Sequence, residues 1–143
     1  MLRAKAMGDY LRFKNSLPAK LSEFAILLTA RHWTQSYQWA LHQPLALKAG
    51  LSTALVTAVE EGRRPTDLDA GEQVLFDFVT ELLNHQSVSD PSYAAAVRLF
   101  GEQGTIDLVS LCGYYTFIAL VLNVARTRVP LKAPTLPPFV CAG

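Results

Sequence analysis

The stretch "EFAILLTARHWTQSYQWALHQPLALKAGLS", Glu23 to Ser52, decides the fold of this chain. Apolar residues recur in it at every third or fourth position, which is the spacing of an α-helix with one buried face. Thr34 interrupts this pattern near the middle, and Gly50 follows its end. We therefore expect two consecutive helices that fold back on each other as a hairpin.

Polar residues and proline predict where these two helices begin. Ser16 is the expected N-cap of the first helix, which has Pro18 in its first turn and covers residues 19–33. Thr34 is the expected N-cap of the second helix, over residues 35–49. Both assignments rest on side-chain oxygens that can accept hydrogen bonds from the first free backbone amides of a helix.

Two further helices follow the hairpin. Ser52 is expected to cap a short helix that ends at Gly62. Asp69 and Glu72 have the spacing of a capping box, in which each side chain accepts a bond from the other residue's backbone amide. This pattern predicts a helix over residues 70–85.

The last part of the chain predicts two more helices. Asp90, followed by proline, begins one that ends near Gly101 or Gly104. Thr105 is the expected cap of a long final helix that reaches about Arg126. Together with the absence of alternating β patterns, these signals predict a compact, all-α single-domain bundle of about six helices.

Composition and charge exclude several classes of function. The 13 basic and 12 acidic side chains nearly cancel, so we expect no binding to nucleic acid. The first residues lack a continuous apolar segment of the signal-peptide kind, and we expect a cytoplasmic protein. Cys112 and Cys141 form no CxxC pair, which suggests free thiols in a reducing compartment. No His, Cys or carboxylate spacing predicts a metal site.

The run from Leu108 to Ala125 is the most apolar part of the chain. Polar residues such as Ser110 and Asn123 interrupt it, so we expect a helix buried on all sides and no membrane span. A helix that is apolar all round needs cover on every face, and a small domain has few elements to supply it. We therefore expect the chain to self-associate.

A polar stripe crosses the second helix of the hairpin. Gln35, Gln38 and His42 are separated by three and four positions and share one helix face. The simplest interpretation is that they meet solvent or bond to each other. Glu23, taken alone, is expected to be exposed, but a closed hairpin brings it to His42, and such a pair can move protons near neutral pH.

The same stretch resembles the core of the carboxymuconolactone decarboxylase and alkylhydroperoxidase D superfamily. In that family a glutamate stands nineteen positions before a histidine, and a Gly-Leu/Val-Ser/Thr turn follows the histidine. Glu23, His42 and the turn that begins at Gly50 reproduce these spacings. The resemblance covers residues 17–128. It leaves residues 1–16 as an N-terminal helical extension and residues 129–143 as a Pro-rich, extended tail. It implies the alkylhydroperoxidase D-like fold and assembly as a trimer or hexamer.

The chain departs from the peroxidase branch of that family. Peroxidase members have a CxxC whose cysteines stand seven and four positions before the histidine, and here Gln35 and Gln38 occupy those places. An amide cannot form the thiolate that attacks a peroxide. Cys112 lies in the most apolar helix, where a thiol is expected to be inert. A thiol peroxidase is thus the disfavoured alternative.

The decarboxylase branch remains open, because it needs neither cysteine nor cofactor. The resemblance implies a lyase that acts on a small cyclic or unsaturated carboxylic acid. In such an enzyme His42 would transfer a proton, and Glu23 would orient the His42 imidazole. The expected substrate contacts are Arg31, as a carboxylate clamp, with Gln35, Tyr37, Gln38 and Trp39. Many relatives have an acidic residue where this chain has Gln38. A further alternative is a catalytically silent subunit for ligand binding or assembly.

Overall fold

Helices α2 (Ala19–His32) and α3 (Ser36–Lys48) form the predicted hairpin. They belong to a computed structural model that describes residues 2–138, in which six helices and no strands are present. Helix α2 is the centre of the molecule, because α3, α5 and α6 all pack on it. The fully buried side chains gather around it and include Phe24, Ile26, Leu27, Trp39, Leu75, Phe78, Leu108 and Leu111.

The turn inside the hairpin differs from the prediction. Thr34 has a positive φ of 48° and lies before the helix, so the Thr34 cap is wrong. Gln35 is the N-cap of α3, and its side-chain oxygen accepts a 3.0 Å hydrogen bond from the backbone amide of Gln38. The longer glutamine side chain reaches the same position on the helix end that a threonine hydroxyl normally occupies.

The predicted cap of α2 is also wrong. Pro18 is the N-cap residue and forms no side-chain cap. The hydroxyl and the backbone amide of Ser16 both donate to Asp107 Oδ2, at 2.7 and 2.9 Å, while Gln103 donates to Oδ1 at 3.0 Å. Ser16 therefore fastens the segment before α2 to α6, a long-range contact that local spacing does not reveal.

Asp107 should make this junction sensitive to acid. Burial alone would raise its pKa, but the hydrogen bonds from Ser16 and Gln103 outweigh burial and lower it. A lowered folded-state pKa stabilises the fold above the unfolded value of 3.8, and this contribution is lost as the pH falls through the folded value. We expect Asp107→Asn to lower the free energy of unfolding by about 1–3 kcal/mol at neutral pH.

Urea denaturation of this variant at several pH values checks the prediction. The difference from the wild type should stay constant above pH 3.8 and shrink below it. Asp77→Asn is the control, since Asp77 is exposed and its ion pair with Arg64 contributes little to stability. A difference that is the same at all pH values would contradict a role for the Asp107 carboxylate.

The next two helices begin as predicted. Ser52 caps α4 (Thr53–Glu60), where its hydroxyl accepts a bond from the amide of Leu55 at 3.1 Å. Asp69 and Glu72 form both halves of the capping box at the start of α5 (Ala70–His85). Helix α5 packs against both α2 and α6.

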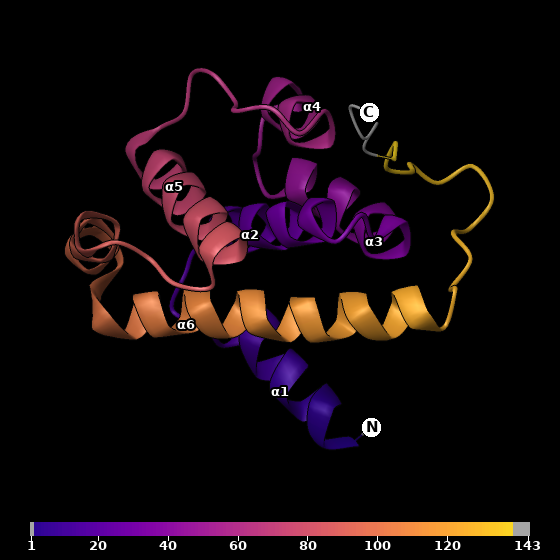
Figure 1. Cartoon of the computed structure of the whole chain (residues 1–143), viewed down its shortest axis with the longest axis horizontal. Coiled ribbons are helices and arrows are strands. Elements are labelled where there is room, and N and C mark those ends of the chain that lie inside the picture. Colours follow the sequence, from indigo (N-terminus) through magenta and orange to yellow (C-terminus); the bar gives the residue numbers. More distant parts are fainter. Residues whose placement is uncertain (1, 139–143) are drawn as a thin grey trace.

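Helix α6 (Asp90–Val124) is long and broken. Gly101 has φ 74° and ψ 173°, which interrupts the helix where the sequence predicts an end. In Figure 1 the part before this break is seen end-on, while the part after it runs along the longest axis of the molecule. The predicted Thr105 cap is wrong, because Thr105 lies inside the resumed helix and its hydroxyl donates to the carbonyl of Gly101 at 2.8 Å.

The apolar part of α6 is covered on one side only. Tyr115 and Leu108 are buried, but Ile106 is 60% and Phe117 52% exposed, so the prediction of burial on all sides is wrong for the single chain. Among the described residues, α6 is the one helix long and apolar enough to cross a membrane, and 39% of its apolar window is buried. One such helix is weak evidence of a span, because core helices share these properties.

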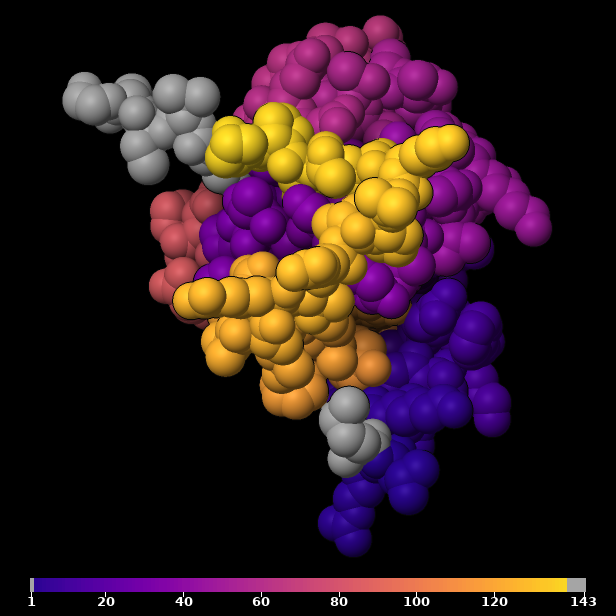
Figure 2. Space-filling model, turned by 90° about the vertical axis from the view of Figure 1, so that its right-hand side faces the viewer, coloured from indigo at the N-terminus to yellow at the C-terminus, as the bar shows by residue number. Residues whose placement is uncertain are grey.

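The two ends of the described chain lie on the outside of the bundle. Helix α1 (Leu2–Phe13) packs on α6 through its buried residues Gly8 and Leu11. The Pro-rich segment after α6 forms no helix and crosses the surface of α2 and α3 (Figure 2). It is attached there by Leu136, which is buried and whose backbone amide donates to the Ser36 hydroxyl at 3.3 Å.

Candidate functional site

The hairpin brings Glu23 and His42 together. His42 Nδ1 lies 2.8 Å from Glu23 Oε2, and the two side chains are only 7% and 15% exposed. The predicted approach of Glu23 to His42 in a closed hairpin is therefore confirmed, whereas the simpler interpretations, that His42 meets solvent and that Glu23 is exposed, are wrong. When Nδ1–H donates to the carboxylate, the second ring nitrogen, Nε2, has a free lone pair that can accept a hydrogen bond or a proton.

Tyr115, on α6, completes this cluster. Its ring meets the His42 imidazole edge-on, with ring centres 5.0 Å apart. Burial raises the pKa of the Tyr115 phenol far above its ordinary value, and the nearby Glu23 carboxylate adds to this while Arg12 opposes it. The phenol is consequently a neutral hydrogen-bond donor at any physiological pH.

His42 and Tyr115 face a cavity of about 300 Å³. On the α6 side it is lined by Tyr114, Tyr115 and Ile118. On the α1 side it is lined by Lys5, Gly8, Asp9 and Arg12. The cavity thus combines an imidazole that is bonded to a buried carboxylate, a phenol and charged groups, and its size suits a small organic ligand.

Gln38 and Trp39 lie in the core near this pair. Both polar atoms of the Gln38 amide, and the Trp39 indole nitrogen, are buried without a hydrogen-bond partner among the described residues. Buried polar groups are nearly always paired, so these atoms point to bound water or a ligand, or they destabilise the fold. Neither residue lines the cavity of His42.

Substitution of Gln38 distinguishes these possibilities. Met has nearly the same length, and removing an unpaired amide should raise the free energy of unfolding by about 1 kcal/mol. Gln35→Met is the matched control, since both amide atoms of Gln35 are bonded, and it should lower stability by about 1–3 kcal/mol. Urea denaturation measures both. A loss in Gln38→Met as large as in the control would show that the amide is engaged.

Gln35 and Tyr37, the other predicted substrate contacts on α3, lie apart from the cavity lining. Besides capping α3, Gln35 donates from Nε2 to Asn123 Oδ1 at 2.9 Å, and Asn123 in turn donates to the carbonyl of Trp33. This chain ties the hairpin turn to the end of α6. Tyr37 is half-buried.

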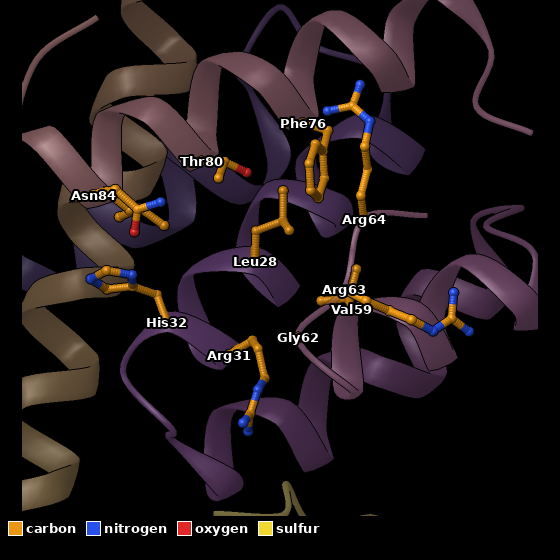
Figure 3. Close-up of a pocket in the computed structure, with 11 residues that line it drawn as sticks. Leu28, Arg31, His32, Val59, Gly62, Arg63, Arg64, Phe76, Thr80 and Asn84 are labelled. Carbon is orange, nitrogen blue, oxygen red and sulfur yellow. The ribbon is translucent and has the colours of Figure 1, made fainter. Parts of the chain in front are cut away.

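Arg31 is not brought to His42. It lines a second cavity, of about 150 Å³, together with His32, Phe76 and Thr80. Figure 3 shows its guanidinium turned away from Phe76 and Thr80. Its Nη1 donates to the carbonyl of Pro137 at 2.7 Å, so it holds the C-terminal segment against the hairpin.

Cys112 behaves as its sequence context predicts. It is a free, buried cysteine, and burial raises the pKa of its thiol to about 12. A bond from Thr29 lowers the pKa by a smaller amount. Cys141 lies outside the described residues. Within residues 2–138, no three His, Cys, Asp or Glu side chains converge in the manner of metal ligands.

Sequence reasoning missed two parts of this site. From the sequence, Tyr115 is expected to be a structural tyrosine in an apolar helix, because the sequence does not indicate which face of α6 contacts α3. The cations on α1, Lys5 and Arg12, lie in the segment that was assigned from the sequence to an N-terminal extension.

No family model matches the chain, and a search of curated proteins finds no similar sequence.

Proposed function

We propose that this chain is a cofactor-independent, carboxy-lyase-like enzyme of the carboxymuconolactone decarboxylase kind, with an alkylhydroperoxidase D-like fold. Its substrate is a small cyclic or unsaturated carboxylic acid. The observation that carries this proposal is the buried Glu23–His42 pair, 2.8 Å apart, of which His42 lines a cavity. The all-helical hairpin with this pair agrees with the sequence resemblance.

His42 is the proton carrier in this proposal. Loss of carbon dioxide breaks a carbon–carbon bond and leaves its electron pair on the substrate, where it is delocalised as an enolate. His42 Nε2–H gives its proton to that carbon, and solvent restores the proton. The Glu23 carboxylate holds the imidazole by Nδ1 and stabilises its positive charge before transfer.

Tyr115 is the group suited to stabilise the enolate. Its phenol is neutral, lines the same cavity as His42 and can donate a hydrogen bond to a developing oxyanion. Gln38 was expected from the sequence to contact the substrate, but it is not among the residues that line the cavity. We therefore propose Tyr115 as the donor to the enolate and assign no catalytic role to Gln38, which is buried in the core.

Thiol peroxidase chemistry remains disfavoured. Positions 35 and 38 hold glutamines, and Cys112, with a pKa of about 12, has almost no thiolate near neutral pH. A thiol in this state does not attack a peroxide at a useful rate.

A second candidate function is assembly. The exposed apolar side chains of α6 recur on one face of the helix and include Ile106, Val109, Phe117, Leu120, Val121 and Val124. Such a stripe on a single chain suggests contact with another protein surface. We propose self-association, as a trimer or hexamer, through this face. A silent subunit would have the same stripe, so this observation supports assembly without supporting catalysis.

The test of the proposed enzyme is carbon dioxide release from a panel of carboxylated lactones and β-keto acids across the pH range. We expect release from at least one member in the presence of a metal chelator and without added cofactor. No release from any member would contradict the proposal. Ligand-dependent stabilisation without turnover would then favour the silent ligand-binding subunit.

A further inference from the structure

The wall of the cavity opposite His42 is a single face of α1. Lys5, Gly8, Asp9 and Arg12 are spaced by three, one and three positions, so they lie on one side of that helix. Gly8 makes this docking possible, because a Cβ atom there would come within 2.3 Å of the Tyr114 hydroxyl. Leu11, also buried, anchors the same helix.

The charged residues on this face are exposed, and the Arg12 guanidinium lies over the Phe13 ring, 5.0 Å from its centre, a contact that does not use its N–H donors. Within residues 2–138, no carboxylate forms an ion pair with Lys5 or Arg12. Arg12 acts electrostatically on Tyr115, which places its charge near the His42 cluster. Asp9 lines the same wall, so the two cations leave a net charge of about +1 facing the cavity.

We propose that Arg12 and Lys5 bind the carboxylate of the ligand and position it over His42 and Tyr115, so that α1 is a functional part of the site. The guanidinium of Arg12 offers two parallel donors to a carboxylate, and Lys5, two turns earlier, adds a second cation. This takes over the role that the sequence suggested for Arg31, whose Nη1 is bonded to Pro137. The reaction at His42 rests on the proposed function, whereas carboxylate binding does not.

A binding experiment without turnover tests this proposal. The probes are benzoate and sorbate, a cyclic and an unsaturated carboxylate, and their uncharged amides, titrated calorimetrically against the whole chain. We expect both carboxylates to bind more tightly than the amides and to weaken as salt is added. In the double variant Arg12→Gln/Lys5→Gln the affinity should fall roughly tenfold or more.

Arg3→Gln is the matched control. Arg3 is exposed on the same helix but lies nine positions, or about two and a half turns, before Arg12 and so on the opposite side. It should bind the carboxylates as the wild type does. Arg12→Lys should keep most of the affinity that Arg12→Gln loses, because lysine retains the positive charge. A purely structural role for Arg12 would not predict this dependence on charge.

The outcomes separate this proposal from the proposed function. His42→Asn should retain carboxylate binding even where carbon dioxide release is lost, and binding without any release leaves the α1 site standing. Equal affinity of the double variant and Arg3→Gln overturns the proposal. So does equal binding of acids and amides, or no saturable binding of either carboxylate at millimolar concentration.

Discussion

The His42→Asn variant should release carbon dioxide about 10²- to 10⁴-fold more slowly than the wild type, the usual contribution of a positioned proton-transfer group. Asparagine fills part of the same space but cannot carry a proton to carbon. The loss should appear in kcat, because the carboxylate of the substrate is bound by groups on α1. The measurement is the initial rate of release at saturating substrate.

Two controls make this result specific. His85→Asn changes the same residue type at an exposed position at the end of α5 and should leave the rate unchanged. Glu23→Gln keeps a hydrogen-bond acceptor near Nδ1 but removes the charge, and we expect an intermediate rate. If His42→Asn retains the wild-type rate while its thermal stability is unaltered, His42 is not the proton carrier.

Trp39→Ala should lower the free energy of unfolding by about 3–5 kcal/mol. Trp39 is fully buried in the core beside α2, so the substitution opens a large cavity that the neighbouring side chains cannot fill. The sequence suggested instead that Trp39 contacts the substrate. Urea denaturation measures the stability, and steady-state kinetics on the same samples measures KM.

Trp39→Phe is the comparison for this prediction. Phenylalanine keeps an aromatic ring and removes an indole nitrogen that has no partner among the described residues, so it should cost much less stability than alanine. A small loss of stability in Trp39→Ala, together with a large rise in KM, would instead support the substrate contact.

The helices could be predicted from the sequence wherever the signal was local. The Asp69–Glu72 capping box and the break at Gly101 both depend on neighbours within a few positions, and both are present. The caps at Ser16 and Thr34 failed for different reasons. Ser16 donates its hydrogen bond to Asp107, 91 positions away. At the start of α3, the side chain of Gln35, and not that of Thr34, accepts the hydrogen bond from the helix end.

The site was predictable in part. The nineteen positions between Glu23 and His42 span one hairpin, so their meeting follows once two antiparallel helices are expected. Tyr115 and Arg12 come from α6 and α1, and their approach depends on how separate helices pack. Arg31 shows the same limit, because the proline-rich segment that binds it has no periodic pattern that predicts its path.

The break at Gly101 also sets the outer dimensions of the molecule. As one straight rod, the 35 residues of α6 would measure about 52 Å, whereas residues 102–124 alone measure roughly 34 Å. Nothing lies within 4 Å of a Cβ atom at this glycine, so its positive φ, and not lack of space, is what resists other residues there. The length of the molecule along α6 thus depends on a single backbone conformation, and a residue that straightened this helix would lengthen the protein in that direction.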